Sequence, residues 1–203
     1  MYQTPQEAFW AGEFGNEYID RSQGLAPIIL YMFAHILDRT DNVESMLEFG
    51  ANIGNNLQAI HTFMPQTAID AVEINEKAVR ALKEHSFMRN IYHSSIIDFE
   101  ISLQYDLVMT SGLLIHISPS HLPLAYDKMY NASKKFILMI EYYNPTPMEV
   151  PYRNHTNVLF KRDFPGELMD RHPGVTLVDY GFIYNRTANF SGEDNFWFLM
   201  RKP

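Results

Sequence analysis

The stretch of this sequence best suited to hold a ligand is a glycine-rich turn between an apolar run and a helix-like segment. The turn reads Gly50-Ala51-Asn52-Ile53-Gly54. Gly50 lets the chain leave a strand without a Cβ clash, and Asn52 is one of the few non-glycine residues that tolerate a positive φ. Gly54 removes a side chain where a ligand or a packed neighbour comes close. Taken alone, the turn fits an ordinary loop as well as a binding site.

A second residue, Glu73, favours the binding site. It lies 23 residues beyond Gly50, at the end of the next predicted strand. In doubly wound α/β folds, an acid about 20 residues after the glycine turn accepts hydrogen bonds from ribose hydroxyls. Two carboxylate oxygens match two vicinal hydroxyls. We therefore predict a nucleoside-binding site formed by Gly50 and Glu73.

The acidic residue that precedes the turn, Glu48, helps to distinguish between NAD and S-adenosylmethionine as the ligand. NAD sites prefer the pattern G-x-G-x-x-G, so that bare backbone reaches the pyrophosphate. Here Glu48 precedes the first glycine by two residues. A carboxylate at that place repels a pyrophosphate but attracts a ligand that carries an ammonium group. The pattern favours S-adenosylmethionine (SAM), with S-adenosylhomocysteine (SAH) as its product, over NAD.

These motifs need a scaffold that brings the ends of neighbouring strands together. Apolar runs that are typical of strands alternate with helix-like segments from Ser45 onward, which predicts βαβ units and a parallel sheet. The last two runs, joined by a short polar loop, predict an antiparallel hairpin at the sheet edge. The predicted strands are 45–49, 67–72, 90–93, 105–110, 135–141, 175–184 and 195–201; the predicted helices are 27–37, 54–63, 75–85, 119–130 and 163–171.

Two segments lie outside this alternation. The first, residues 1–40, is rich in aromatic and charged side chains over 6–21, and it either forms a helical lid over the pocket or packs its rings on the core. The second, residues 142–160, holds three prolines and little periodicity. Irregular insertions of this length in compact domains are usually functional or mobile. We expect it on the substrate side of a single domain that spans residues 1–203.

Composition narrows the classes of partner. The formal charge is −8 and basic residues are scattered, which argues against nucleic acid. The absence of cysteine excludes disulfides, Cys-zinc sites and thiol catalysis. No apolar run reaches the roughly 20 residues of a membrane span, and the N-terminal residues lack a signal-peptide pattern. We expect a cytoplasmic monomer or homodimer with a small-molecule substrate, no membrane partner and no metal.

From about Ser45 to its C-terminus the sequence resembles the class I SAM-dependent methyltransferases. Residues 47–54 look like their first motif, Val72-Glu73 like the second, and 105–110 with 114–116 like the fourth strand and its following turn. The resemblance implies an α/β, Rossmann-like fold: a mostly parallel seven-stranded sheet with an antiparallel last strand and helices on both faces. The cofactor contacts expected within this region are Glu48, Gly50, Asn52, Gly54, Glu73, Ile74, Ser95, Ile96 and Thr110.

The sequence departs from the family pattern at two places. Asn52 replaces the commoner second glycine of the first motif, which a residue that tolerates positive φ accommodates. Ser95 and Ile96 stand where the adenine-contacting segment falls, but the usual Asp is absent there. Asp98 is a candidate for a shifted substitute.

A narrower resemblance extends over nearly the whole chain. Residues 9–21, 50–54, 141–145 and 160–164 look like the methylases associated with pseudaminic acid biosynthesis. That resemblance implies a nonulosonate sugar or a sugar-derived intermediate as the acceptor, without naming the acceptor atom. In the N-terminal segment, we expect Trp10 and Tyr18 to close the pocket. Arg21 is expected to pair with the SAM carboxylate.

Methyl transfer to a hydroxyl or an ammonium needs a base that removes the acceptor's proton. His116 is the main candidate, because it follows the fourth strand and has an unperturbed pKa near 6.5. Tyr142 and Tyr143 leave the fifth predicted strand at the same sheet edge. They could orient the acceptor or face the sulfonium, and they could equally be packing residues.

Three other functions remain open from the sequence. The chain could be a methyltransferase-like SAM-binding module without methyl transfer, although Gly50, Gly54 and Glu73 argue against a lost site. It could methylate a protein or glycoprotein instead of a small molecule. It could also be an NAD-dependent enzyme, which Glu48 disfavours.

Overall fold

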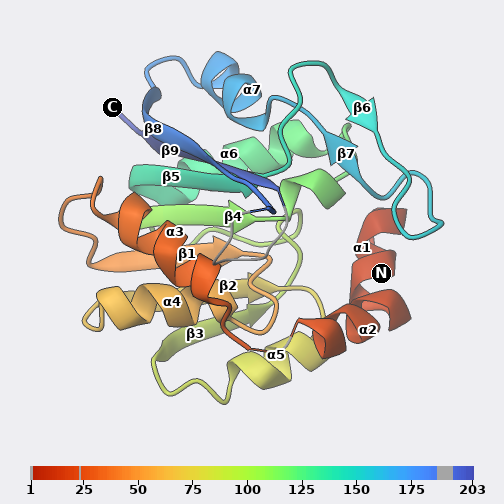
Figure 1. Ribbon diagram of the computed structural model, residues 1–203, viewed down its shortest axis with the longest axis horizontal. Coiled ribbons are helices and arrows are strands. Elements are labelled where there is room, and N and C mark those ends of the chain that lie inside the picture. Colours follow the sequence, from red (N-terminus) through yellow and green to blue (C-terminus); the bar gives the residue numbers. More distant parts are fainter. Residues whose placement is uncertain (1, 23, 187–193) are drawn as a thin grey trace.

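The centre of the molecule is a twisted, mostly parallel β-sheet (Figure 1). The computed structural model describes residues 2–22, 24–186 and 194–203. Within them, seven strands form the sheet in the order β3-β2-β1-β4-β5-β9-β8. The first five are mutually parallel, and β9 runs antiparallel to both β5 and β8. The strands are β1 (Ser45–Phe49), β2 (Ala68–Glu73), β3 (Met88–His93), β4 (Tyr105–Ser111), β5 (Ser133–Glu141), β8 (Thr176–Ile183) and β9 (Asn195–Arg201). The predicted fold class is confirmed.

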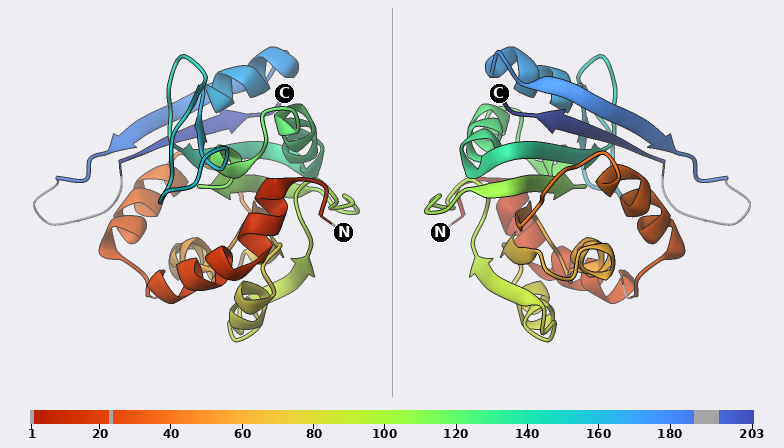
Figure 2. Two further views of the ribbon diagram at one scale, coloured as in Figure 1. Left: turned by 90° about the vertical axis from the view of Figure 1, so that its right-hand side faces the viewer. Right: turned by 90° about the vertical axis from the view of Figure 1, so that its left-hand side faces the viewer.

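Helices cover both faces of the sheet (Figure 2). On one face, α3 (Pro27–Leu37), α4 (Asn55–Phe63) and α5 (Glu76–Leu82) enclose an apolar core against the strands. On the other, α6 (Leu122–Ala132) and α7 (Phe164–Arg171) enclose a second core. β1 and β4 are buried on both faces and read as nearly continuous apolar runs, as parallel strands in doubly covered sheets do.

Two short helices at the N-terminus, α1 (Pro5–Ala11) and α2 (Glu13–Arg21), lie beyond the carboxyl ends of the parallel strands (Figure 1). A capping box starts α1: the Thr4 hydroxyl accepts from the backbone N–H of Glu7, and the Glu7 carboxylate accepts from the N–H of Thr4. Gly12 separates the two helices. We name α1 and α2 together the N-terminal cap.

The chain after β4 differs from the sequence prediction. A short 3₁₀ turn, η1 (Leu114–His116), comes first, and α6 begins at Leu122 rather than at Pro119. Pro123 occupies the first turn of α6, where its missing N–H costs nothing. The predicted start of this helix, at Pro119, is therefore three residues too early.

The insertion 142–160 is less irregular than predicted. Met148–Glu149 (β6) pairs antiparallel with Phe160–Lys161 (β7), and a single bridge joins Tyr152 to His155. The rest of the insertion is loop that runs beside α1 (Figure 1). Most of the predicted polar loop between β8 and β9 lies outside the described residues. Among the helices that are described, none has both the length and the apolar character needed to cross a membrane.

Candidate functional site

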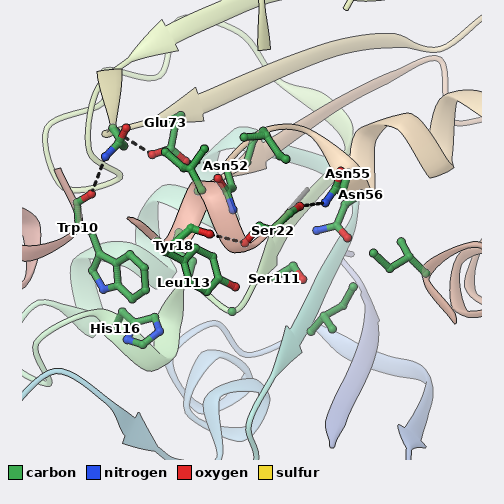
Figure 3. Close-up of a pocket in the computed structure, with 18 of the residues that line it drawn as sticks. Trp10, Tyr18, Ser22, Asn52, Asn55, Asn56, Glu73, Ser111, Leu113 and His116 are labelled. Carbon is green, nitrogen blue, oxygen red and sulfur yellow. Dashed lines mark hydrogen bonds between the residues drawn. The ribbon is translucent and has the colours of Figure 1, made fainter. Parts of the chain in front are cut away.

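A cavity of about 320 Å³ lies where the carboxyl ends of the parallel strands meet the N-terminal cap and α3. This is the edge at which open α/β sheets bind their ligands, and the volume is at the lower end of small-molecule sites. Figure 3 shows Trp10 and His116 side by side, and Asn55 and Asn56 well apart from them. The predicted site residues that line the cavity are Trp10, Tyr18, Gly50, Asn52, Glu73, Ile74 and His116.

The glycine turn has the backbone conformation that its residue types predict. Gly50, Asn52 and Gly54 have φ values of 73°, 49° and 87°, and Gly50 and Asn52 line the cavity. A Cβ on Gly50 would lie 2.9 Å from a methyl carbon of Leu113, and one on Gly54 would lie 2.9 Å from a methyl carbon of Leu82. Gly54 is not among the lining residues, so its small size serves the packing of the turn against the end of α5.

Glu73 fixes the two backbone segments that border the cavity. One carboxylate oxygen accepts from the N–H of Asn52 at 2.7 Å, and the other accepts from the N–H of Asn75 at 2.7 Å. Burial raises the pKa of Glu73, whereas these hydrogen bonds lower it. A backbone hydrogen bond from Ile74 also lowers this pKa. An ionised carboxylate has about four acceptor sites, so these bonds leave acceptor capacity for a ligand hydroxyl.

Asn75 connects this carboxylate to the N-terminal cap. Its side chain caps α5, accepting from the N–H groups of Lys77 and Ala78. Its amide nitrogen also donates to the carbonyl oxygen of Trp10 at 3.1 Å and to the side chain of Asn16 at 3.0 Å. The position of the cap over the cavity therefore depends on the same loop that holds Glu73 (Figure 3).

Glu48 lies beneath the turn instead of in the cavity wall. It is fully buried, one carboxyl oxygen accepts from the amide of Asn56 at 2.8 Å, and the other has no hydrogen-bond partner among the described residues. Burial raises the pKa of Glu48 to about 8, and the charge of Glu73 adds to the rise. A pKa of about 8 keeps most of this carboxyl group protonated at pH 7. Glu48, predicted as a cofactor contact, does not line the cavity, whereas its partner Asn56 does.

The raised pKa of Glu48 predicts that the stability of the protein depends on pH. Replacement of Glu48 by glutamine should remove this contribution to the pH dependence. A folded-state pKa of about 8 against a model value of 4.5 means that the folded protein holds this proton more tightly. The contribution of Glu48 to the free energy of unfolding therefore falls as pH rises from 4.5 towards 8. As pH rises from 5 to 9, the free energy of unfolding of Glu48→Gln should increase relative to that of wild type by on the order of 2–4 kcal/mol. Urea unfolding at each pH measures this difference.

The exposed Glu44 provides the matched control for this experiment. Glu44→Gln should follow the wild-type curve at every pH. Other buried groups titrate in all three proteins and cancel in the differences between them. A pH-independent difference between Glu48→Gln and wild type would contradict the raised pKa.

A smaller pocket adjoins the cavity and contains Ser95 and Ile96, the predicted adenine-contacting residues. Trp10, Gly50, Ile74, Leu113 and His116 border both spaces. Asp98 does not take the place of the missing family acid: it is exposed, accepts from the side chain of Gln3 and lies outside both linings. Its backbone N–H donates to the Ser95 hydroxyl.

His116 borders both spaces from the turn after β4. Its Nδ1 is 2.6 Å from the carbonyl oxygen of Val158, and its ring centre is 4.4 Å from that of Trp10. Because a carbonyl oxygen only accepts, Nδ1 carries the proton and Nε2 keeps its lone pair. Burial lowers the pKa of His116 from the ordinary value near 6.5 to about 4.

Glu141 holds the turn that carries His116. Its buried carboxyl accepts from the backbone N–H groups of Leu113 at 3.2 Å, Leu114 at 3.1 Å and Ile115 at 3.4 Å. Burial raises the pKa of Glu141 to about 7, and the hydrogen bonds oppose this rise. The last residue of β5 thus fixes a turn that follows β4, and His116 depends on both strands for its place.

Several predicted contacts lie outside the cavity lining. Arg21 is on the solvent side of α2, 3.7 Å from Glu17. The ring of Tyr142 lies under the ammonium of Lys161, and Tyr143 packs on Phe196 and Phe198 of β9. The predicted residues that border neither the cavity nor the smaller pocket are Arg21, Glu48, Gly54, Thr110, Tyr142 and Tyr143. Thr110 is fully buried at the end of β4, and the next residue, Ser111, reaches the cavity instead.

The sequence analysis missed several polar residues that reach the cavity. The amide of Asn55 donates to the carbonyl oxygen of Ser22 at 2.8 Å, which joins the turn to the end of α2. Asn55 and Asn56 directly follow the first motif, so their position next to the glycine turn could have predicted that they reach the cavity. Ser22 and Asn195 carry no such signal, because only tertiary packing brings them there. The polar lining residues without a predicted role are Ser22, Asn55, Asn56, Asn75, Ser111 and Asn195.

Comparison with solved structures defines the class of fold. The 1,6-didemethyltoxoflavin-N1-methyltransferase of Burkholderia thailandensis, with its acceptor and SAH bound, superimposes with a TM-score of 0.69 at 13% identity, over 97% of this chain and 86% of the other. The N-methyltransferase NodS of Bradyrhizobium japonicum WM9, in complex with SAH, gives 0.68 at 15% identity over 92% and 97%. The amino pentose methyltransferase CalS10 of Micromonospora echinaspora, bound to SAM, gives 0.65 at 10% identity over 94% and 96%.

The chain therefore has the fold of the class I SAM-dependent methyltransferases. No protein-family model and no curated protein matches its sequence. At identities of 10–15% the agreement is one of fold. Within the part of the chain that the structure describes, no three His, Asp or Glu side chains gather as a metal site would require.

Proposed function

We propose that this protein is a SAM-dependent methyltransferase that acts on a small molecule. The observation that carries the proposal is the arrangement at the end of β2. Glu73 borders the cavity, is fixed by the N–H groups of Asn52 and Asn75, and sits beside a turn with three residues at positive φ. An acid at this place in a doubly wound fold accepts hydrogen bonds from ribose hydroxyls.

The residues present fit SAM along the length of the cavity. Glu73 would hold the ribose, and the backbone of Gly50 and Asn52 would lie along the methionine portion. The amides of Asn55 and Asn56 border the far side, where an amino-acid head group needs polar partners. When bound, SAM supplies a methyl group on a sulfonium, which is transferred by in-line displacement.

His116 is the proposed proton acceptor. Its Nε2 lone pair is available because Nδ1 donates to Val158, and its pKa of about 4 makes it a weak base at neutral pH. A weak base suffices when the proton leaves late. A hydroxyl oxygen that gained a methyl group would carry positive charge and be strongly acidic, so its proton would pass to Nε2 as the new O–C bond forms and the bond from carbon to the sulfonium sulfur breaks.

The N-terminal cap and the insertion are proposed to close the site together. The side-chain amide of Gln6 donates to the carbonyl oxygen of Asn157 at 2.7 Å. The rings of Phe9 and Phe14 pack on the ring of His155, with distances between ring centres of 4.9 Å and 5.5 Å. These contacts join residues about 150 positions apart. The N-terminal cap, which is the part of residues 1–40 that contacts the insertion, and residues 142–160 would then act as one cover that opens for exchange of ligands.

Isotope transfer tests the proposed activity. The protein is incubated with methyl-labelled SAM and an extract that has been separated into a metabolite fraction and a protein fraction. We expect label in the metabolite fraction, and none when SAM binding is blocked with excess SAH. Label confined to the protein fraction would favour a protein acceptor. SAH binding without transfer to either fraction would favour a binding module without activity.

For the acceptor, we propose a nonulosonate sugar or a sugar-derived intermediate. The sequence resemblance to the pseudaminic acid-associated methylases supports this class. A structural neighbour named as an amino pentose methyltransferase has the same fold over 94% of this chain.

A specific observation favours a second acceptor class, a neutral and largely apolar molecule. The end of the cavity towards α3, β5 and β8 is distant from Glu73, which lies three strands away from β5 in the sheet. None of the described residues that line that end carries a formal charge. They are Ile28, Ile29, Met32, Ser111, Ile140, Ile183 and Asn195. Burying an unpaired carboxylate or phosphate among them costs several kcal/mol.

Two probes distinguish these acceptor classes in the presence of saturating SAH. N-acetylneuraminate represents an anionic nonulosonate, and methyl 4-hydroxybenzoate represents a neutral apolar acceptor. The sugar proposal predicts that N-acetylneuraminate binds, whereas the apolar lining predicts that only methyl 4-hydroxybenzoate binds; calorimetry or ligand-observed NMR measures both. Ile28→Lys should weaken its binding about tenfold by placing a charge in the lining, while Ala34→Lys on the exposed side of α3 should not. Binding of N-acetylneuraminate alone would favour the sugar.

A further inference from the structure

The smaller pocket has a polar wall that the sequence motifs do not explain. Gln6 and Glu7, both on α1, line it and are only 3% and 5% exposed. One side-chain oxygen of each, Oε1 in both residues, is buried without a hydrogen-bond partner. Buried polar atoms of proteins are nearly always paired, so two neighbouring exceptions on one wall of a pocket need an explanation.

The other polar atoms of both side chains are already used. The Gln6 amide nitrogen donates to the carbonyl oxygen of Asn157 at 2.7 Å. The second Glu7 oxygen accepts from the N–H groups of Gln3 at 2.6 Å and Thr4 at 3.0 Å. Neither side chain can turn to satisfy its free oxygen without giving up these bonds. The two free oxygens are thus held in place as acceptors.

The position of the pocket relates these acceptors to the nucleoside. Ile74 directly follows Glu73 and borders both the cavity and the smaller pocket. A base attached to a ribose at Glu73 would extend past Ile74 towards Ser95 and Ile96. The acid that the family places in this segment is absent, and Asp98 is exposed and does not line the pocket. The pocket therefore lacks its usual acceptor and has two others.

We propose that Gln6 and Glu7 recognise the base of the cofactor by accepting hydrogen bonds from its exocyclic amino group. The proposal rests on the proposed function, because it needs the nucleoside of SAM at Glu73. Adenine carries a 6-amino donor beside ring nitrogens that accept. Two acceptor oxygens match the two N–H groups of that amine. The indole N–H of Trp10, also buried without a partner and also lining the pocket, is a donor of the kind that a ring nitrogen accepts.

The same wall rejects a 6-oxo base. In hypoxanthine the 6-position is an acceptor, which would face the oxygens of Gln6 and Glu7 and leave all three without donors. Sites built to pair a polar group discriminate strongly against an analogue that lacks it, because their own buried atoms stay unpaired. A base-reading role thus predicts a preference that a purely structural role of α1 does not.

The test compares SAH with S-inosylhomocysteine, its 6-oxo analogue, by titration calorimetry. Wild type should prefer SAH by at least about 100-fold. Gln6→Leu should weaken SAH about tenfold and reduce the preference by a similar factor. Gln6→Glu keeps acceptor oxygens but loses the donor to Asn157. Unlike Gln6→Leu, it should therefore show the wild-type preference for SAH over the 6-oxo analogue. Glu7→Gln should reduce it, and Gln3→Ala, on the same segment but outside both linings, should leave it unchanged.

The outcomes separate the two levels of the proposal. If SAH binds and Gln6→Leu and Glu7→Gln keep the full preference over the 6-oxo analogue, the base-reading role is wrong while the proposed function stands. If the variants lose SAH and the analogue equally, α1 only supports the fold, and the inference is again overturned. If wild type binds neither compound, the proposed function itself fails.

Discussion

Replacement of Glu73 by alanine is expected to weaken SAH binding at least about 100-fold. The change removes the two acceptors proposed for the ribose hydroxyls, and hydrogen bonds to a charged group contribute about 1.5–3 kcal/mol each. It also leaves the N–H groups of Asn52 and Asn75 without the carboxylate that now accepts them. Titration calorimetry of SAH against the wild-type and variant proteins measures the effect.

Two further variants show whether the loss comes from the ribose contact. Glu76→Ala removes an exposed carboxylate of the same loop region, which pairs with Arg80 and does not border the cavity. It should bind SAH like wild type. Glu73→Gln keeps the size of the side chain but has one acceptor oxygen instead of two, so its affinity should fall between those of wild type and Glu73→Ala. Unchanged affinity in Glu73→Ala, with the fold retained, would remove Glu73 from the site.

Replacement of His116 by alanine is expected to lower methyl transfer by about 100-fold or more while SAH still binds. General acid–base groups contribute typically 10²–10⁴-fold to turnover. The readout is transfer from labelled SAM to the acceptor fraction, compared with SAH affinity from calorimetry. His121→Ala, a nearby imidazole that borders neither pocket, is the control.

The lowered pKa of His116 adds a pH criterion to this prediction. A pKa of about 4 keeps Nε2 unprotonated throughout the range above pH 5. Turnover at saturating substrates should therefore not fall between pH 7 and pH 6 through protonation of His116. A His116-dependent fall with a midpoint near 6.5 would show that the ring is solvated, and normal turnover of His116→Ala would exclude it as the proton acceptor.

Much of the fold could be predicted because local patterns determine it. The helix Pro27–Leu37 has the predicted bounds, since Pro27 sets its first turn and apolar residues recur at helical spacing. The strands β1 and β9 also match their predicted ranges. One boundary moved where two prolines offer competing start signals: the predicted helix starts at Pro119, whereas α6 starts at Leu122 with Pro123 in its first turn.

The part of the site that sequence reasoning found is the part encoded within one βαβ unit. Gly50, Asn52 and Glu73 are brought together by two adjacent parallel strands, and the spacing between them carries that information. The positive φ of Asn52 followed from its residue type alone. Their spacing in the sequence and the adjacency of the two strands were enough to predict that these residues lie together at the site.

The rest of the site depends on contacts between distant segments. Burial of Glu48 beneath the turn changes its charge state, and no feature of the sequence reports burial depth. Tyr143 packs across the sheet on β9, which sequence position could not distinguish from facing the ligand. Gln6 and Glu7 reach the pocket of Ser95 only because the N-terminal cap folds over the end of the sheet.

The most direct measurement of the central claim is titration of the wild-type protein with SAH, with NAD as the comparison ligand. The proposed site predicts one SAH bound per chain with a dissociation constant in the micromolar range or below, and no detectable binding of NAD under the same conditions. Absence of SAH binding at millimolar concentration, or tighter binding of NAD than of SAH, would contradict the assignment of this cavity to S-adenosylmethionine.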